Sequence, residues 1–179
     1  MRASADGGGG DVPEGVYGAS RAAHRRAFYE CVSDLLEEPE VRRMGAHRQH
    51  GETSRLKHSL NVAYYSYRVA KALRLDCRSA ARGALLHDLF FYDWKECGLT
   101  PLGHARLHPH IAHTNASCVT DLNEVESDII LKHMWLCSRD RPIYGESLIV
   151  TLVDKMCACA EALADVPVKG GRGRRRQGP

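Results

Sequence analysis

An adjacent histidine and aspartate, His87 and Asp88, stand inside an apolar stretch of the chain, residues 84–91. Burying an unpaired carboxylate in such a stretch is costly, and binding a cation would remove that cost. The same reasoning applies to Asp154, which directly follows the apolar residues 148–153. Imidazole and carboxylate groups are ligands for Mn, Fe, Co, Ni or Zn. Metal ligation therefore explains both positions, although a separate buried salt bridge could explain each of them.

The spacing of apolar residues predicts the helices that would position these side chains. Apolar residues recur every three or four positions along most of the chain, which is typical of amphipathic helices. No stretch alternates between apolar and polar residues with hairpin turns at its ends, so the predicted fold class is all-α. Side chains that commonly cap helices precede four of the predicted helices: Ser20, Thr53 or Ser54, Asp76, and Asn123 with Glu126. The helices are predicted over residues 20–38, 54–75, 77–88, 109–119, 124–133 and 147–164.

The segments between these helices are expected to be loops. Residues 90–108 contain two glycines and a proline and are predicted to be irregular. Pro109 suits the first turn of the next helix, so His108 would lie directly before that helix. The segment that precedes His58 could form a loop that folds over a site, although solvated loop residues are the more ordinary interpretation. Its polar members are His47, Gln49, His50, Thr53 and Arg55.

One domain with two tails is the expected organisation of the 179 residues, of which 44% are hydrophobic. Residues 1–18 are rich in glycine and residues 167–179 are basic, and both tails are predicted to be disordered. Residues 19–166 would form the domain. Subtracting the five charges of the basic tail from the formal net charge of +3 leaves −2 for the rest, so no nucleic-acid partner is expected. The five cations are Lys169, Arg172, Arg174, Arg175 and Arg176.

His58 precedes the His87-Asp88 pair by 29 residues, and Asp154 follows Asp88 by 66 residues. This order, with His58 in the sequence Lys-His-Ser-Leu-Asn, resembles that of the HD-domain metal-dependent phosphohydrolases. The resemblance covers residues 53–164 and is strongest to the small stand-alone bacterial HD proteins. It implies a single-domain helical bundle of the HD type.

Two further histidines, His108 and His133, are similar to ligands of the branch of that family that binds two metal ions. By this resemblance Asp88 would bridge the two ions. A water molecule shared by two divalent ions becomes hydroxide near neutral pH, which suits the hydrolysis of phosphate esters. The implied metal ligands are His58, His87, Asp88 and Asp154 for one ion, and Asp88, His108 and His133 for the other.

The resemblance implies a divalent-metal-dependent phosphohydrolase of a small phosphorylated molecule, with nucleotides as the favoured class. Besides Asp88, the candidate catalytic residues are Asp93, for protonation of the leaving group, and Lys155, for contact with phosphate. Each lies close in sequence to an implied ligand, although a loop cap and a surface lysine are ordinary uses of these residues. Three histidines that flank His108 are interpreted as spares: His104, His110 and His113.

Two other functions stay open. The same order of ligands also serves di-iron HD oxygenases, and a regulatory protein could keep the metal without turnover. Phe91 favours the regulatory alternative, because some relatives carry Glu or Lys at this position, three residues after Asp88. Cleavage of cyclic dinucleotides is disfavoured, because the chain has His133-Met134 where that branch usually has two histidines.

The seven cysteines are odd in number and scattered, and no charged-then-apolar leader precedes them. A reducing, cytoplasmic compartment is therefore expected. The longest apolar runs fall far short of the roughly 20 residues that cross a bilayer, so no membrane partner is expected. The oligomeric state does not follow from the sequence.

Overall fold

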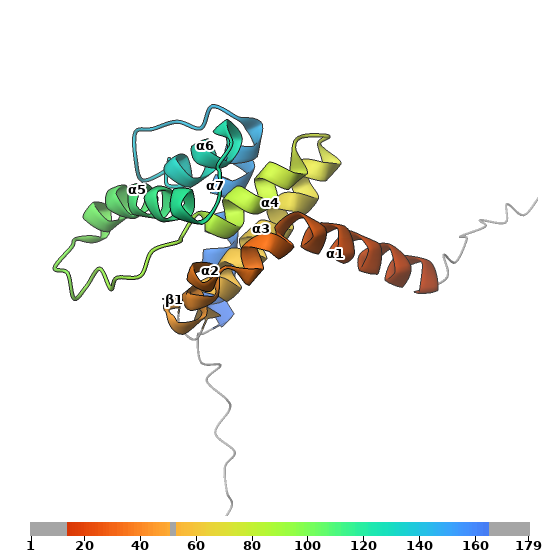
Figure 1. Ribbon diagram of the computed structural model, residues 1–179, viewed down its shortest axis with the longest axis horizontal. Helices are drawn as coiled ribbons and strands as arrows, with labels where there is room; N and C mark the ends of the chain where they lie inside the picture. Colours follow the sequence, from red (N-terminus) through yellow and green to blue (C-terminus); the bar gives the residue numbers. More distant parts are fainter. Residues whose placement is uncertain (1–13, 51–52, 165–179) are drawn as a thin grey trace, which may run out of the picture.

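The computed structural model describes residues 14–50 and 53–164. Seven α-helices, one short 3-10 helix and one two-stranded hairpin make up this part of the chain, so the predicted all-α fold class is confirmed (Figure 1). Residues 1–13 and the basic tail lie outside the described residues. In chain order, the elements are α1 (Glu14–Glu37), α2 (Pro39–Arg43), the 3-10 helix η1 (Met44–Ala46), β1 (Arg48–His50), β2 (Thr53–Ser54), α3 (Arg55–Ala72), α4 (Cys77–Leu86), α5 (Pro101–Val119), α6 (Glu124–Lys132) and α7 (Gly145–Ala164).

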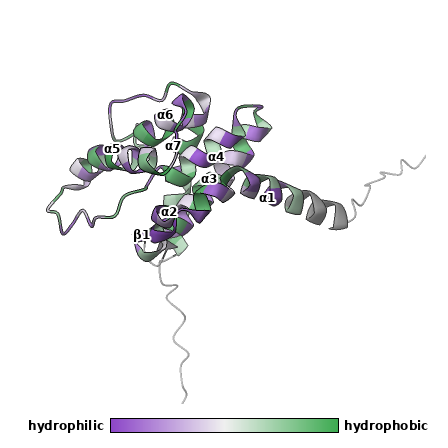
Figure 2. Ribbon diagram, viewed as in Figure 1, coloured by the Kyte–Doolittle hydropathy of each residue, from purple (hydrophilic) through white to green (hydrophobic). Residues whose placement is uncertain are grey.

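Helix α4 is the centre of the bundle. It contacts α1, α3, α5, α6 and α7, and all of its residues from Ser79 to Leu86 are buried. The helices carry both hydrophobic and hydrophilic residues along their length (Figure 2). No helix of the described part is long and apolar enough to cross a membrane. Because α4 is enclosed on several sides, the residues at its carboxyl end emerge in the interior of the bundle.

Gly83 of α4 packs tightly against Ile129 of α6. A Cβ atom added at Gly83 would lie 2.9 Å from Cδ1 and 3.0 Å from Cβ of Ile129. Contacts this short force one of the two helices to move. The glycine is therefore needed where α4 packs on α6.

We expect Gly83→Ala to lower the free energy of unfolding by about 1–2 kcal/mol, because overpacking outweighs the roughly 1 kcal/mol by which alanine favours a helix over glycine. Urea denaturation of the purified protein measures this change. Gly45→Ala is the matched control, because its Cβ would meet Leu56 at an ordinary 3.7 Å. Equal stability of the two variants would show that α4 and α6 are not tightly packed at this point.

The predicted caps of three helices are confirmed. Ser54 precedes α3 and accepts a hydrogen bond from the backbone N–H of Lys57, and Asp76 caps α4 through two backbone N–H groups. Asn123 and Glu126 form a capping box at the start of α6. These caps fix where α3, α4 and α6 begin, and so fix which residues face the interior.

The predicted start of α5 was wrong. The helix begins at Pro101, because Thr100 caps it by accepting a hydrogen bond from the N–H of Gly103 at 3.0 Å. Pro101 then occupies the first turn, where a missing N–H costs nothing. Pro109 lies inside the helix and leaves the carbonyl of Ala105 without its usual intrahelical donor. The irregular segment is therefore shorter than predicted and ends at Thr100.

Two other boundaries also differ from the sequence prediction. Helix α1 begins at Glu14 rather than after Ser20, so residues 14–18 are helical instead of unstructured. A helix anchored by packing at one end extends at one hydrogen bond per residue, which composition alone does not reveal. The antiparallel pair β1 and β2 was not predicted, because strands of three and two residues are too short to show alternation.

Candidate metal centre

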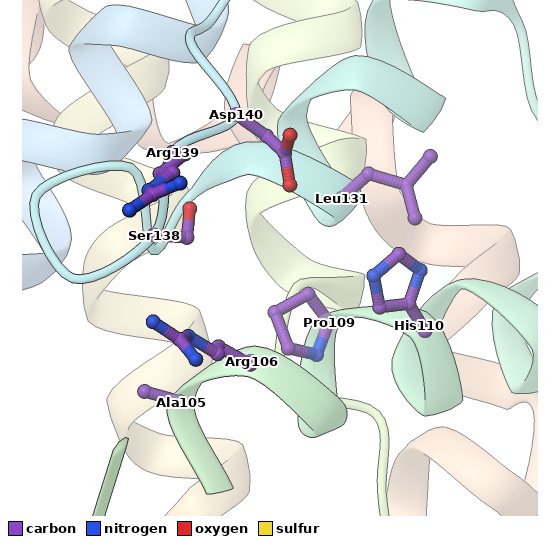
Figure 3. Close-up of a pocket in the computed structure, with 8 residues that line it drawn as sticks. All are labelled: Ala105, Arg106, Pro109, His110, Leu131, Ser138, Arg139 and Asp140. Atoms are coloured by element: carbon purple, nitrogen blue, oxygen red, sulfur yellow. The ribbon is translucent and has the colours of Figure 1, made fainter. Parts of the chain in front are cut away.

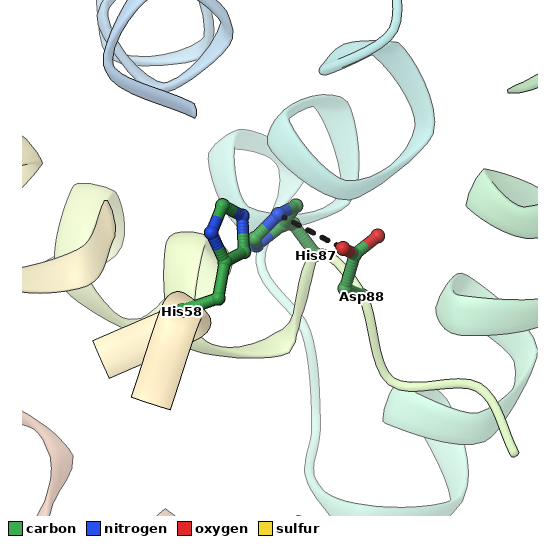
Figure 4. A group of neighbouring side chains, drawn as sticks. All are labelled: His58, His87 and Asp88. Atoms are coloured by element: carbon green, nitrogen blue, oxygen red, sulfur yellow. Dashed lines mark ion pairs between the residues drawn. The ribbon is translucent and has the colours of Figure 1, made fainter. Parts of the chain in front are cut away.

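Helices α3 and α4 bring His58, His87 and Asp88 together. His58 lies in the first turns of α3 on its buried face, and His87 forms the carboxyl-terminal cap of α4. Asp88 follows immediately, just beyond the helix rather than within its last turn as predicted. The three side chains converge in the interior (Figure 4). Their positions follow from the caps at Ser54 and Asp76, which set where the two helices begin.

The other three implied ligands come from the remaining helices. His108 lies inside α5, His133 forms the carboxyl-terminal cap of α6, and Asp154 lies on the buried face of α7. The structure thus brings together all six residues that the family resemblance implied. All six are buried, with exposed fractions between 0% and 6%.

Three of the histidines have one ring nitrogen fixed by a backbone carbonyl. Nδ1 lies 2.7 Å from the Ala84 oxygen in His87, 2.9 Å from the His104 oxygen in His108, and 2.8 Å from the Ile130 oxygen in His133. A carbonyl oxygen can only accept, so Nδ1 must carry the hydrogen in each ring. When these imidazoles are neutral, each therefore presents the lone pair of Nε2 to the centre, which is the form that binds a metal.

His58 is oriented by a carboxylate instead. Its Nδ1 lies 2.9 Å from Oε2 of Glu161, and the other oxygen of Glu161 accepts a hydrogen bond from Asn61 at 3.2 Å. Its Nε2 lies 3.0 Å from Oδ1 of Asp154. A carboxylate behind a histidine ligand holds the ring in place and increases its basicity. Glu161 was not predicted as a site residue, because it is 103 positions from His58 along the chain.

The free nitrogens and the carboxylates face one another at short range. Nε2 of His108 lies 2.8 Å from Nε2 of His133 and 3.2 Å from Oδ1 of Asp88. The other oxygen of Asp88 lies 3.5 Å from Nε2 of His87, which in turn lies 3.7 Å from Oδ1 of Asp154. Asp88 therefore directs one oxygen to each half of the centre.

The donor atoms fit divalent cations. Nε2 of His87 and Oδ1 of Asp88 are buried and have no hydrogen-bond partner, which is costly for groups of this polarity. His58, His87 and Asp88 form one group that could hold an ion, and Asp88, His108 and His133 form another. A cation in each group would satisfy the two atoms that have no partner. It would also separate the nitrogen lone pairs of His108 and His133.

The carboxylates control the protonation of the centre when no metal is bound. Burial lowers the pKa of His87, but Asp88 and Asp154 outweigh it and raise this pKa to about 9. Burial alone would raise the pKa of Asp88, yet His87 and His108 hold it well below its usual range. Burial together with His87 and His108 keeps the pKa of His133 far below its ordinary value. At neutral pH the metal-free centre therefore holds ionised carboxylates and a proton on His87.

We expect metal affinity to rise with pH up to about 9. A cation must displace the proton of His87, and that proton is held until the pH passes a pKa of about 9. Each proton released raises the apparent affinity about tenfold per pH unit in this window. Calorimetric titration of chelator-treated protein with Mn²⁺ in buffers of different ionisation enthalpy measures both quantities. An affinity that does not change with pH, with no proton released, would contradict this charge assignment.

A pocket of about 930 Å³ opens onto the centre. Asp88, Asp154 and the predicted residues Asp93 and Lys155 are among the side chains that line it. The ammonium group of Lys155 lies 2.6 Å from Oδ2 of Asp154. Asp93 is exposed and accepts a hydrogen bond from the backbone N–H of Lys95 at 2.8 Å, so it also caps a turn. Both residues therefore border the space where a substrate would meet the centre.

The residues around the start of α3 lie over the centre rather than in solvent. The side-chain amide of Gln49 donates to Asp88, and Nε of Arg55 donates to the oxygen of Gln49 at 2.9 Å. Arg55 is 5% exposed, and its guanidinium lies 3.7 Å from the ring centroid of Phe90. The prediction that Gln49 and Arg55 are solvated loop residues was therefore wrong. The hairpin of β1 and β2 returns the chain to this position.

His104 also belongs to the site, although it was interpreted as a spare. It lies four residues before His108 on the same face of α5, and the two rings stack with centroids 4.6 Å apart. Its Nδ1 is 3.0 Å from the hydroxyl of Tyr92, and burial with His108 lowers its pKa to about 4. The four-residue spacing would have indicated this, had α5 been predicted from Pro101. Phe91, in contrast, packs against Arg43 and His47.

Comparison with known proteins is consistent with this geometry. Residues 55–159, more than half of the chain, match the family model described as the HD domain. The matched segment includes all six residues of the candidate metal centre. No curated protein and no solved structure matches the chain.

Proposed function

Because this chain belongs to the HD-domain family of metal-dependent phosphohydrolases, we propose that it hydrolyses a small phosphorylated molecule at a dinuclear metal centre, with nucleotides as the favoured substrate class. One observation supports this proposal most strongly. The histidines that surround Asp88 have their Nδ1 atoms occupied by acceptors and direct Nε2 inward, where two buried polar atoms have no partner. HD domains bind divalent metals, and this donor set suits them.

We assign the ligands to two ions that share Asp88. His58, His87 and Asp154 would complete the protein ligands of one ion, whereas His108 and His133 would hold the other. The division follows the two groups of donor atoms, which have only Asp88 in common. Imidazole and carboxylate admit Mn, Fe, Co, Ni or Zn, so the ligand set leaves the choice among these metals open.

The chain's own groups would bind the phosphate and handle protons. When bound, the ions supply an activated water molecule and neutralise charge on the phosphoryl group. Lys155 would contact a phosphate oxygen, and the buried guanidinium of Arg55 would add a second positive charge in the same pocket. Gln49 would hold the Asp88 carboxylate in its bridging orientation. Asp93, on the rim, is the proposed proton donor to the leaving group.

The shape and lining of the pocket support a substrate of nucleotide size. Its volume of about 930 Å³ falls in the range of small-molecule sites. Tyr92 and Trp94 also line it, and Trp94 stacks on His104 with centroids 5.6 Å apart. An aromatic wall would suit a planar base, while the cations and metals suit the phosphate.

We expect Lys155→Met to lower kcat/KM by at least tenfold, about 1.4 kcal/mol, while two metals stay bound. The reason is the loss of a positive charge that faces the phosphate. Lys57→Met is the control, because Lys57 is also next to an assigned ligand but is exposed. Phosphate release and metal content are measured on the same preparations. Full activity of the Lys155 variant would remove this residue from the proposed machinery.

The proposed function is tested with protein purified without oxygen and supplied with each metal in turn. We expect Mn or Co to restore phosphate release from a panel of nucleoside mono-, di- and triphosphates and sugar phosphates, and chelation to stop it. Two bound irons with substrate-dependent oxygen uptake would instead identify a di-iron oxygenase. Retention of metal with neither reaction would identify a regulatory protein. The proposed compartment is the reducing cytoplasm, because the seven cysteines are odd in number and scattered along the chain.

A further inference from the structure

A second pocket lies beside α5, with a volume of about 400 Å³ (Figure 3). It is lined by Ala105 and Pro109 from α5, by Leu131 from α6, and by the loop that follows α6. Ala105 lines both this pocket and the pocket of the metal centre. The polar residues that line it are Arg106, His110, Ser138, Arg139 and Asp140.

Two arginines contribute positive charge to this pocket. Arg106 and Arg139 stand on one side of it in Figure 3, with the hydroxyl of Ser138 between them. Within the described part of the chain, neither guanidinium has a carboxylate partner. Arginine presents a planar set of donors that matches the oxygens of phosphate. Two such groups around one hollow make a phosphate a suitable ligand.

The opposite side of the pocket differs in chemistry. Pro109 and Leu131 supply an apolar surface, and Asp140 supplies a carboxylate at the edge (Figure 3). A carboxylate repels phosphate but accepts hydrogen bonds from hydroxyl groups. We propose that this pocket binds a small phosphorylated molecule that carries hydroxyl groups, with its phosphate between Arg106 and Arg139. This site is separate from the metal centre and does not depend on the proposed turnover.

The position of the pocket connects it to one half of the metal centre. Pro109 follows His108 directly, and Leu131 lies two residues before His133. These are the two histidines assigned to the second ion. Pro109 also removes a hydrogen bond from α5 at Ala105, so the helix is less constrained here. A ligand that moves Pro109 or Leu131 would therefore change the affinity of the centre for the second ion. By linkage, the second ion would change the affinity of the pocket for the ligand.

Fluorescence of Trp135 tests the proposal on the full, metal-loaded chain. The chain has two tryptophans, and Trp94→Phe leaves Trp135, whose carbonyl accepts a hydrogen bond from the Ser138 N–H at 3.2 Å. Ribose 5-phosphate is the probe, and inorganic phosphate tests the phosphate group alone. We expect a saturable change in fluorescence with both, and tighter binding of ribose 5-phosphate.

Matched variants in the Trp94→Phe background identify the site. The double variant Arg106→Gln/Arg139→Gln should weaken binding of the probe at least tenfold. The control is the double variant Arg25→Gln/Arg78→Gln, which removes two exposed arginines elsewhere and should not weaken binding. Lys155→Met should leave the affinity for the probe unchanged, because Lys155 does not line this pocket. A signal that does not saturate, or that is lost in the Lys155 variant but kept in the Arg106/Arg139 variant, would overturn the proposal. Because Arg106 and Arg139 do not line the pocket of the metal centre, the comparison of these variants stays interpretable even if the proposed hydrolysis fails.

Discussion

Replacing Asp88 with alanine is expected to abolish turnover and the tight binding of both metal ions. Asp88 directs Oδ1 toward His108 and Oδ2 toward His87, so it is the one residue assigned to both ions. Without it, nothing fixes the spacing of the two ions. We expect kcat/KM to fall by at least 10³-fold, about 4 kcal/mol of lost transition-state stabilisation. Inductively coupled plasma mass spectrometry measures the loss of metal, and phosphate release measures the loss of turnover.

The Asp88 variant should also lose stability, because buried imidazoles would face one another without the carboxylate. Asp121→Ala is the control, since Asp121 is an exposed aspartate outside the centre. Circular dichroism on both proteins separates loss of metal from loss of fold. A folded Asp88 variant that keeps two tightly bound metals would contradict the bridging role.

Replacing His133 with alanine should have a different result. His133 is assigned to the second ion only, so about one metal per chain should remain, bound by His58, His87, Asp88 and Asp154. The side chain is 1% exposed but lines the pocket, so its removal leaves a gap that water can enter. We expect the fold to survive and activity to fall by at least 10²-fold, about 2.7 kcal/mol, because one ion no longer neutralises the phosphate.

His113→Ala is the matched control, because His113 lies on α5 but belongs to neither group of donor atoms. Both variants are dialysed and counted with the wild-type protein in one series. Retention of two metals and full activity by the His133 variant would disprove the assignment of this residue to a second ion.

Much of the fold follows from local chemistry that is visible in the sequence. Ser54, Asp76 and Asn123 are strong capping residues, and each one begins the helix that it was predicted to begin. The start of α5 was less clear, because Pro101 and Pro109 both suit a first turn. The cap at Thr100 decides between them, and proline inside a helix is the exception.

Part of the candidate metal centre could be predicted because His87, Asp88 and Asp154 stand out from apolar surroundings. Its other histidines, His58, His108 and His133, were implied only by the family resemblance. The supporting residues could not be predicted in the same way. Glu161 contacts His58 only because α3 packs on α7, and Gln49 contacts Asp88 only because a short hairpin turns the chain back. Such contacts depend on packing between distant segments, and no local pattern marks them.

The presence and position of two metal ions is the central claim, and anomalous X-ray diffraction at the absorption edge of the bound metal tests it directly. Crystals of protein loaded with Mn²⁺ should show two anomalous peaks for each chain. One peak should lie among His58, His87, Asp88 and Asp154, and the other among Asp88, His108 and His133. A single peak, or a peak outside these residues, would contradict a dinuclear centre bridged by Asp88.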